Sequence, residues 1–582
     1  MKKKSLISIL LIMVLVASCF LTGCGSDEPA GDDQAAQGKV YHTYMSEDMP
    51  TLNPHNYTGT QLDTVFAYVH STLWIRVPNE DGTGYNWVGD LAADLPEQID
   101  ELTWQVTLRD DACWQNGTPL TVDDLIYSWQ MLIDPNLVNS MANFFWYSID
   151  IANAEAYFNG ECDWEDVGIK KIDDKTFQII TETPAVMDDV CQNFLDRSMF
   201  PVWKEAYEAG MNEDRTETSY GTELSDFVGA GPYILDTWTP DSVHVYKKNA
   251  DHWNAGYYNY DTVEMYIVGE NNARLQMFEQ GTLDTYEPDS NSIDTYIDDP
   301  RILVYGSTSV EHCDINCKNP ENPISGSVNY RKALYHAFDR ATIAEKCFGY
   351  YEPAGWYINA SAGILSEDNV PYRETKYGKA TNDLIESWGP NGYNPELARE
   401  YLAKAYEECG VAEDTVITLK LAFDGSDTNW KKTGEFIQQE WPEIFEGKIK
   451  VDILNYSGIS TTEFKAGNDA GWDLSPNQWS RSLSRQYPYT AFYYYLSSYD
   501  GSPNNVFSDK FDAQYAACEA AETYEEQLAE TQKLEEIYLE EVIHVPLVQY
   551  VNYSMYSDRV QLPMKQYVPG IGWGATFGDI VE

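Results

Sequence analysis

The chain has 582 residues, which is too long for one simple hydrophobic core and predicts two to four structural units. Apolar residues make up 43% of it and aromatic residues 14%, which indicates a folded globular protein rather than a disordered one. The formal net charge of −55 argues against nucleic acid as a partner, because that binding depends on Lys and Arg that neutralise phosphates, and against broad contact with anionic lipid headgroups.

The first residues have the pattern of a secretory signal peptide. A basic stretch, Lys2–Lys4, precedes an apolar run from Leu6 to Phe20. A membrane-spanning helix needs about 20 apolar residues, and this run is interrupted at Ala17-Ser18-Cys19. We therefore interpret residues 1–23 as a cleaved signal peptide.

The segment after the apolar run predicts a lipid anchor. Leu21-Thr22-Gly23-Cys24 resembles the bacterial lipobox, in which the Cys thiol is acylated and becomes the new amino terminus. Residues 24–38 contain no large apolar side chain and are expected to form a flexible tether. No later segment approaches the length of a membrane span, so the rest is expected to be soluble. The alternative is an ordinary signal peptide with an incidental Cys.

Strand and helix patterns alternate through the rest of the chain, without an internal repeat. Leu102–Leu108 alternates apolar and polar residues and predicts a half-buried strand. Thr121–Asp124 resembles a capping box that opens a helix, which Pro135 ends. The predicted apolar face of that helix is Val122, Leu125, Ile126, Trp129, Leu132 and Ile133.

Further elements follow in chain order. Gly229–Tyr233 predicts a turn that leads into a strand from Ile234 onward. Helices are predicted over 342–348 and 395–409, and an acidic helix over 521–538 with Leu528, Leu534, Ile537 and Tyr538 inward. A late strand is predicted over 544–548. These patterns indicate a mixed α/β chain.

Cysteine gives little information about function. The mature chain would retain Cys113, Cys162, Cys191, Cys313, Cys317, Cys347, Cys409 and Cys518. An even number in an exported protein allows disulfides. His312, Cys313 and Cys317 are close in sequence, but no second cluster completes four metal ligands. We expect buried or paired thiols, and neither a metal site nor a cofactor.

Motifs of catalysis are missing from the sequence. It contains no His-Glu-x-x-His, no Gly-x-Ser-x-Gly, no phosphate-binding loop and no dinucleotide fingerprint. Carboxylates are so abundant that a pair of them is uninformative. A secreted glycosidase with two buried carboxylates therefore stays open as an alternative.

Five segments together resemble a known family. They are Met49–Pro54, Leu102–Pro135, Gly231–Trp253, Tyr330–Arg340 and Val545–Tyr550. In this order and spacing they are similar to family 5 of the bacterial extracellular solute-binding proteins, the oligopeptide- and dipeptide-binding lipoproteins of ABC importers. The resemblance extends over nearly all of the mature chain.

The resemblance implies an α/β fold. We expect a two-lobed clamp like that of the periplasmic binding proteins, with an extra domain, which makes three domains. Domain I is expected to be discontinuous, because the chain crosses between the lobes at a hinge. The expected ranges are 39–60, 198–309 and 552–582 for domain I, 61–197 for domain II and 310–551 for domain III.

The resemblance also implies a function. We expect a substrate-binding lipoprotein that captures peptides outside the cell and delivers them to an ABC transporter by hinge closure. Its expected partners are a peptide-like ligand, the permease subunits and the membrane, through the anchor on Cys24. We expect a monomer without enzymatic activity, held at the outer face of the cytoplasmic membrane on a Gram-positive surface, or alternatively in the periplasm.

One position departs from the family pattern. In many peptide-binding members, an Asp three residues after a groove Trp pairs with the amino group of the peptide. The matching residues here are Trp479 and Ser482, and a hydroxyl cannot replace a buried carboxylate that faces an ammonium. If Arg481 or Arg485 faces the groove, the ligand is anionic or lacks a free amine; the alternative is that both point to solvent or to the acidic surface.

Other ligand-facing residues are placed by the resemblance. Asp48 or Glu47, near the opening strand, is a candidate for the missing negative charge. The aromatic candidates are Trp479, Tyr550 and, from the run Phe144–Tyr147, Phe144, Trp146 and Tyr147. Strand-like alternation would instead place two residues of that run in the core. The lost Asp and the many Trp keep open an oligosaccharide, a cell-wall fragment or a metal chelate as ligand on the same fold.

Overall fold

The computed structural model describes residues 38–56, 59, 61–147, 149–289, 292–349, 351–359, 362, 370–457, 461–465, 471–480, 487–498, 506–521 and 523–581. The predicted signal peptide and the lipid-anchor residue Cys24 lie outside these residues. Among the described helices, none combines the length and the apolar character that crossing a bilayer requires.

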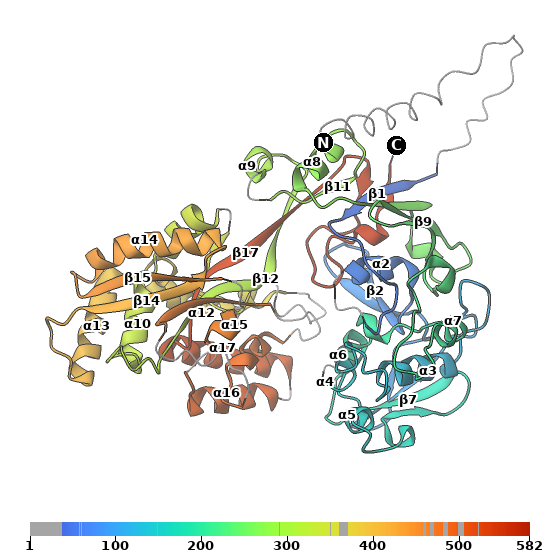
Figure 1. The fold of residues 1–582 in the computed structure, drawn as a ribbon, viewed down its shortest axis with the longest axis horizontal. Coiled ribbons are helices and arrows are strands. Elements are labelled where there is room, and N and C mark those ends of the chain that lie inside the picture. Colours follow the sequence, from blue (N-terminus) through green and yellow to red (C-terminus); the bar gives the residue numbers. More distant parts are fainter. Residues whose placement is uncertain are drawn as a thin grey trace, which may run out of the picture. The chain divides into compact units, whose positions relative to one another are not determined.

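The first sheet pairs the start of the described chain with its middle, in the strand order β1-β10-β9-β8 (Figure 1). Its strands are β1 (Val40–Met45), β10 (Thr262–Ile267), β9 (Val243–Lys248) and β8 (Tyr233–Thr239). β1 runs parallel to β10, and the other two pairs are antiparallel. The helix α2 (Gln61–Val69) packs on this sheet through a core rich in tyrosine.

The turn before β8 requires glycine because the end of α2 passes against it. A Cβ on Gly229 would lie 2.2 Å from the carbonyl oxygen of Val69, and a Cβ on Gly231 would lie 2.4 Å from the carbonyl carbon of Val69. The backbone N–H of Gly231 donates to that oxygen at 2.9 Å. The turn predicted at Gly229–Tyr233 is confirmed, and β8 begins at Tyr233.

A second antiparallel sheet has the order β4-β5-β7-β6. Its strands are β4 (Glu97–Gln98), β5 (Thr103–Thr107), β7 (Thr176–Ile180) and β6 (Ile169–Lys171). The strand predicted over Leu102–Leu108 is confirmed as β5. Helix α3 (Val122–Leu132) packs on this sheet through Trp129, whose ring lies 5.6 Å from that of Phe177. Beside the sheet lie the hairpin of β2 (Trp74–Pro78) and β3 (Tyr85–Gly89) and the short helices α4 (Phe144–Tyr147), α5 (Ala154–Phe158), α6 (Met187–Asn193) and α7 (Lys204–Ala209).

The predicted capping box at the start of α3 is confirmed. The backbone N–H and the hydroxyl of Thr121 both donate to Oδ2 of Asp124, each at 2.8 Å. We expect Thr121→Ala to lower the free energy of unfolding by about 1 kcal/mol, because it removes one of these bonds at the amino end of the helix. Urea unfolding followed by circular dichroism measures the change. The exposed Thr295→Ala is the control, and an equal effect of both substitutions would contradict the role of the box.

The aromatic run Phe144–Tyr147 is a short helix, α4, and not a strand. Alternation therefore does not apply to it, and of its four residues Phe145 alone is fully buried. Phe144 and Trp146 are partly buried against the core, and Tyr147 is 50% exposed. The helical period turns one residue of the run inward rather than two.

The third sheet has seven strands, with the order β11-β17-β12-β16-β14-β15 and β13 paired to β17. Its strands are β11 (Thr285–Tyr286), β12 (Ile302–Ile315), β13 (Glu352–Pro353), β14 (Ile417–Asp424), β15 (Ile449–Tyr456), β16 (Leu474–Ser480) and β17 (Val545–Tyr556). A separate pair is formed by β18 (Val560–Gln561) and β19 (Asp579–Ile580).

Helices pack on this third sheet and contribute to its core. They are α10 (Val328–Ala337), α11 (Arg340–Ile343), α12 (Lys376–Trp388), α13 (Pro395–Cys409), α14 (Thr428–Ile444), α15 (Thr461–Lys465), α16 (Asp509–Glu519) and α17 (Tyr524–Glu541). The helix predicted over 395–409 is confirmed as α13. The helix predicted over 342–348 begins at Arg340 and ends in a π-helical turn, Ala344–Phe348. The acidic helix is confirmed as α17, with its four predicted inward residues buried.

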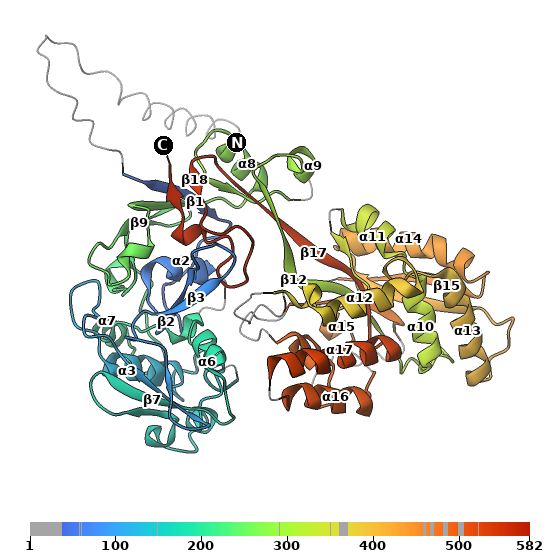
Figure 2. The ribbon, with the colours of Figure 1, turned by 180° about the vertical axis from the view of Figure 1, so that it is seen from behind.

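Two long strands, β12 and β17, lie side by side and antiparallel (Figures 1 and 2). They pair from Ile302 with Met555 to Cys313 with Val545, with register shifts between Gly306 and Val310 and between Glu311 and His312. The late strand predicted over 544–548 is confirmed and extends to Tyr556. The predicted domain boundaries at 309/310 and 551/552 both fall inside this strand pair, and the domain scheme stays a prediction.

Candidate functional site

A cavity of about 400 Å³ lies beside the strand pair. β12 contributes Tyr305 and β17 contributes Val551–Tyr553. The remaining wall residues are Asn271 and Arg274 from α8 (Asn271–Glu279), Glu287–Asp289 after β11, Ile293 from α9 (Ile293–Tyr296), Phe348 and Tyr351. The cavity therefore combines segments on both sides of the predicted hinge boundaries in sequence.

The polar wall of this cavity has charges of both signs. Burial raises the pKa of Glu287, and the nearby Arg274 guanidinium opposes the rise. Arg274 also lies 4.9 Å from the ring centroid of Tyr44. Asn271 is held by its Nδ2, which donates to the Glu287 carbonyl at 3.1 Å, and by the Tyr286 hydroxyl, which donates to its Oδ1 at 2.7 Å. These groups can bind both an anionic and a cationic part of a ligand.

The other wall is aromatic. The rings of Tyr351 and Tyr550 lie 4.3 Å apart, and Phe348 lies 5.8 Å from Tyr351. Tyr305 stacks on Tyr567 at 4.0 Å. Rigid aromatic side chains offer a large contact area at low conformational-entropy cost, so this wall suits ligands of varied side chain.

Behind the aromatic wall lies Glu311 of β12, which is 5% exposed. The Trp430 indole N–H donates to its Oε1 at 2.5 Å, and the Tyr550 hydroxyl donates to its Oε2 at 2.9 Å. Burial raises the pKa of Glu311 to about 7; both hydrogen bonds oppose the rise, and the Asp427 carboxylate adds to it. Residues 310–316 are buried on both strand faces, so alternation does not single out Glu311, and the sequence analysis missed it.

Among the residues predicted to face the ligand, Tyr550 lies beside this cavity, where its ring contacts the cavity residue Tyr351. Trp479 pairs through its backbone with Val310 of β12. The side chain of Trp479, and all of Arg481, Ser482 and Arg485, lie outside the described residues.

The carboxylate of Asp48 is hydrogen-bonded within the protein and does not line this cavity. His244 Nε2 lies 2.9 Å from its Oδ1, and the backbone N–H of Asp241 donates to its Oδ2 at 2.8 Å. The residues of α4 lie elsewhere. Phe144 lines a second cavity of about 770 Å³, and Trp146 packs 5.0 Å from Phe158.

The His-Cys segment does not gather into one cluster. His312 Nε2 lies 2.7 Å from the Tyr495 hydroxyl, while Cys317 lies 3.8 Å from Nη1 of Arg331. Within the described ranges, no three His, Cys, Asp or Glu side chains are arranged to hold a metal ion. The eight described cysteines are free thiols. Four are buried, Cys409 is exposed, and the three that are partly buried are Cys113, Cys162 and Cys317.

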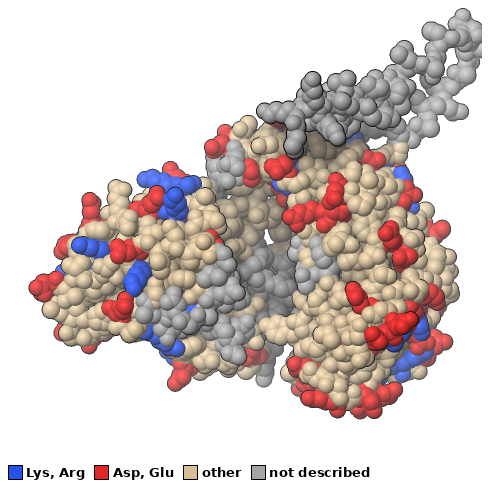
Figure 3. Space-filling view, in the orientation of Figure 1, with Lys and Arg blue, Asp and Glu red and all other residues tan. Residues whose placement is uncertain are grey.

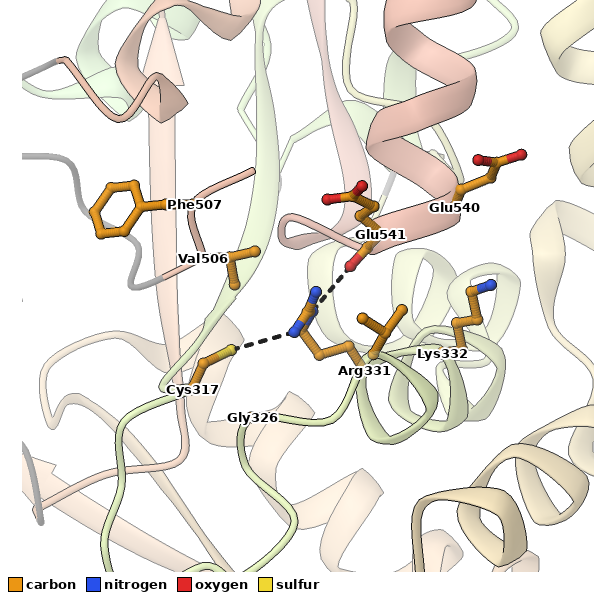
Figure 4. A pocket seen from close by; sticks show the side chains of 9 residues that line it. Cys317, Gly326, Arg331, Lys332, Val506, Phe507, Glu540 and Glu541 are labelled. Carbon is orange, nitrogen blue, oxygen red and sulfur yellow. Dashed lines mark hydrogen bonds between the residues drawn. The ribbon is translucent and has the colours of Figure 1, made fainter. Parts of the chain in front are cut away.

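A third cavity, of about 630 Å³, contains none of the predicted residues (Figure 4). Arg331 lies between Cys317 and Glu541, and its Nε donates to the Glu541 carbonyl at 2.9 Å. Lys332 and Glu540 also line it.

Asp and Glu are spread over the visible face of the molecule and outnumber Lys and Arg there (Figure 3). On this face the acidic residues are therefore distributed rather than gathered at one site.

Comparisons with known proteins agree with this architecture. The sequence model described as "Bacterial extracellular solute-binding proteins, family 5 Middle" matches residues 86–502. The oligopeptide-binding protein OppA of Bacillus subtilis (strain 168) is 25% identical over 465 residues, 78% of each chain. The dipeptide-binding protein DppE of the same organism is 28% identical over 359 residues, 62% of this chain and 60% of the relative.

A solved structure gives the same result for the fold. The unliganded open form of the periplasmic murein tripeptide-binding protein MppA superimposes with a TM-score of 0.73 at 20% identity, over 94% of this chain and 98% of that chain. At this identity the likeness concerns the fold alone. It confirms the predicted α/β fold class of the periplasmic binding proteins.

Proposed function

The chain belongs to family 5 of the bacterial extracellular solute-binding proteins, and from this premise we propose that it captures peptides outside the cell and passes them to an ABC transporter. The match over residues 86–502 carries the proposal. The named functions of OppA and DppE support peptides as the ligand class.

The chemistry of the 400 Å³ cavity suits this ligand class. A peptide presents an ammonium, a carboxylate, amide groups and variable side chains. Arg274 and Glu287 provide opposite charges, Asn271 provides an amide, and Tyr305 and Tyr351 provide apolar area. Such a set favours broad rather than narrow selectivity among peptides.

Delivery by hinge closure is also part of the proposal. The paired strands β12 and β17 cross the predicted boundaries, and their register shifts between Gly306 and Val310. This shift is the wider of the two irregularities in the ladder, and such an irregularity is a suitable place to absorb a backbone rotation. We place the hinge there, with domain I at 39–60, 198–309 and 552–582.

The location follows from the amino-terminal sequence. A lipobox-like Leu21–Cys24 and a tether to residue 38 favour a lipid anchor on Cys24 at the outer face of the cytoplasmic membrane. The protein would act there as a monomer beside the permease subunits. The family comprises binding proteins, so we propose that the ligand is returned unchanged.

A second candidate is a non-peptide or cell-wall ligand on the same fold. Ser482 at the family's Asp position favours it. It shares the site with the first candidate and differs in the chemistry of the ligand.

Mass spectrometry of the ligand that co-purifies with residues 25–582 tests the proposal. We expect peptides of mixed sequence after gentle unfolding. A sugar, a metal chelate or one defined compound would contradict the peptide assignment. Chemical conversion of an added peptide on incubation would contradict a pure binding function and favour a hydrolase.

The aromatic wall gives a prediction for affinity. Tyr351→Ala is expected to weaken binding of a peptide library by about 10- to 100-fold, because it removes the ring between the cavity and Tyr550. Isothermal titration calorimetry measures the change. Tyr257→Ala is the matched control, since Tyr257 is 42% exposed and lies outside the cavity. Equal affinities of the two variants would show that this cavity is not part of the ligand site.

A further inference from the structure

Residues 563–574, near the carboxyl end of the chain, pack against the hairpin of β2 and β3; we call them the C-terminal loop. The backbone N–H of Lys565 donates to the Gly82 carbonyl at 2.7 Å. Nε2 of Gln566 donates to the Thr83 carbonyl at 2.6 Å. These bonds join the hairpin to a loop that lies more than 480 residues later in the chain, since Thr83 and Gln566 are 483 residues apart.

Apolar side chains extend this contact. Met564 and Val568 of the loop are buried together, and Tyr85 of β3 and Ile571 pack against them. The hairpin and the loop therefore share a small core of their own, in addition to the two hydrogen bonds.

Arg76 of β2 lies at the far side of the same contact. It is buried, and its Cζ atom lies 4.9 Å from the ring centroid of Tyr85 and 4.8 Å from that of Trp87. A Cβ on Gly570 would lie 1.6 Å from Nη1 of Arg76, and Gly570 has a φ of +83°. Glycine is therefore required at this position twice, for the close approach and for the left-handed backbone.

The loop also closes on itself and gives its aromatic residues a fixed direction. The backbone N–H of Val568 donates to the Gly572 carbonyl at 3.1 Å, and that of Gly572 donates to the Val568 carbonyl at 2.7 Å. Tyr567, directly before this turn, stacks on Tyr305 with 4.0 Å between ring centroids and 13° between ring planes. Trp573 lies edge-on to both rings, at 5.9 and 6.3 Å.

Tyr305 connects the loop to the proposed ligand cavity. It belongs to β12 and lines the 400 Å³ cavity, as does Asn552, its partner on β17. The next residue, Gly306, begins the wider register shift of the strand pair. Neither Tyr567 nor Arg76 lines this cavity. Tyr567 can therefore affect a ligand there only through Tyr305.

We propose that Tyr567 and Arg76 are positioning residues for ligand binding: the C-terminal loop, held by the hairpin, keeps the ring of Tyr305 in the cavity wall of the unliganded protein. This inference rests on the proposed function. Without the stacked ring, the Tyr305 side chain would populate other rotamers, and a fraction of the molecules would present an incomplete wall. The apparent affinity falls in proportion to the fraction that remains competent.

Such a role has a kinetic signature. Loss of a residue that touches the ligand acts mainly on the dissociation rate, whereas loss of a positioned wall lowers the share of molecules that can bind at encounter. Tyr567→Leu is expected to slow association about tenfold and to leave the dissociation rate within about twofold of wild type. Tyr567→Phe keeps the stacked ring and should behave as wild type. The probe is a tetrapeptide library of mixed sequence, and stopped-flow tryptophan fluorescence of residues 25–582 measures both rates.

Two glycines of the loop give a matched pair. Gly570→Ala places a Cβ on Nη1 of Arg76 and should slow association in the same way as Tyr567→Leu. Gly572→Ala is the control, because Gly572 has a φ of +60° in the same turn, but its Cβ would meet nothing nearer than Cε2 of Tyr567, at 3.7 Å. The control should stay within about twofold of wild type.

Hydrogen exchange of the unliganded protein tests the hold of the loop on β12 without any ligand. The amides of residues 302–306 are expected to exchange about tenfold faster in Tyr567→Leu than in wild type or in Tyr567→Phe, because the stacked ring no longer opposes local opening of the strand.

A double variant completes the test. In a Tyr305→Ala background, Tyr567→Leu should slow association no further, because it acts through Tyr305. Additive losses, a loss confined to the dissociation rate, or wild-type kinetics of Tyr567→Leu would overturn the positioning role while peptide binding stands. If wild type binds no peptide, the proposed function falls and the positioning role for the ligand falls with it; faster exchange in Tyr567→Leu would then support the hold of the loop on β12 alone, and equal exchange would overturn that too.

Discussion

Replacing Arg340 by leucine is expected to cost on the order of 5 kcal/mol of unfolding free energy, enough to unfold the region around the third sheet. Arg340 is fully buried. Its Nε donates to the Pro546 carbonyl at 2.7 Å, and its Nη1 donates to the carbonyls of Tyr335 at 3.1 Å and Asn391 at 3.0 Å. The guanidinium also lies 4.2 Å from the ring centroid of Tyr335. Each carbonyl left without a donor costs about 1–3 kcal/mol.

The position of Arg340 explains why the loss of stability would extend to several elements. It ties the end of α10 and the turn after α12 to β17 by hydrogen bonds to backbone alone. Lysine has one donor centre in place of the guanidinium fork, so Arg340→Lys should recover part of the loss.

Urea unfolding followed by near-ultraviolet circular dichroism measures this effect. The matched control is Arg399→Leu, because Arg399 bonds one carbonyl, that of Ile444 at 3.1 Å, from a partly exposed position. The control should lose less than about 1 kcal/mol. A midpoint for Arg340→Leu as high as that of the control would refute the role given to the guanidinium.

The second large effect is expected at Asp473. Its carboxylate accepts three hydrogen bonds, from Nδ2 of Asn319 at 2.8 Å, from Nδ2 of Asn322 at 2.9 Å and from the backbone N–H of Lys420 at 2.8 Å. Asp473 is 1% exposed. Asp473→Ala leaves these donors unpaired in the interior and is expected to cost about 3–5 kcal/mol. Because Asp473 directly precedes β16, we also expect peptide binding to weaken.

Two further variants test whether the effect is specific to the carboxylate of Asp473. Asp473→Asn keeps the shape but turns a donor toward one of the three N–H groups, so it should be nearly as destabilising. Asp452→Ala, at an exposed position of β15, should change stability by less than about 0.5 kcal/mol. Thermal unfolding and calorimetry on all three are the measurements, and a stable Asp473→Asn that binds peptides normally would contradict the argument.

Local structure could be predicted from the sequence where a short segment decides its own conformation. Asn394 caps α13 by accepting the backbone N–H groups of Glu396 and Leu397, Pro395 begins that helix, and Gly410 ends it in a left-handed conformation. The predicted bounds of 395–409 were therefore correct.

Strand-like alternation, the alternative considered for the run Phe144–Tyr147, does not apply, because neighbouring structure decides its conformation. The run Phe144–Tyr147 has the composition of a strand and forms a helical turn, because its backbone bonds follow the turn that begins at Met141. For the same reason a pattern of aromatic residues did not reveal which of them face a cavity.

The sequence by itself determined the family, the α/β class, the capped helices and the turn before β8, because motifs and caps depend on residues close together in the chain. The tertiary structure alone decided the site. Glu311 meets Trp430 and Tyr550 across 119 and 239 residues, and Asp48 is bound by His244 across 196 residues. Whether a carboxylate is buried and which groups donate to it depends on which distant strands pair around it, and that pairing is set by packing of the whole sheet.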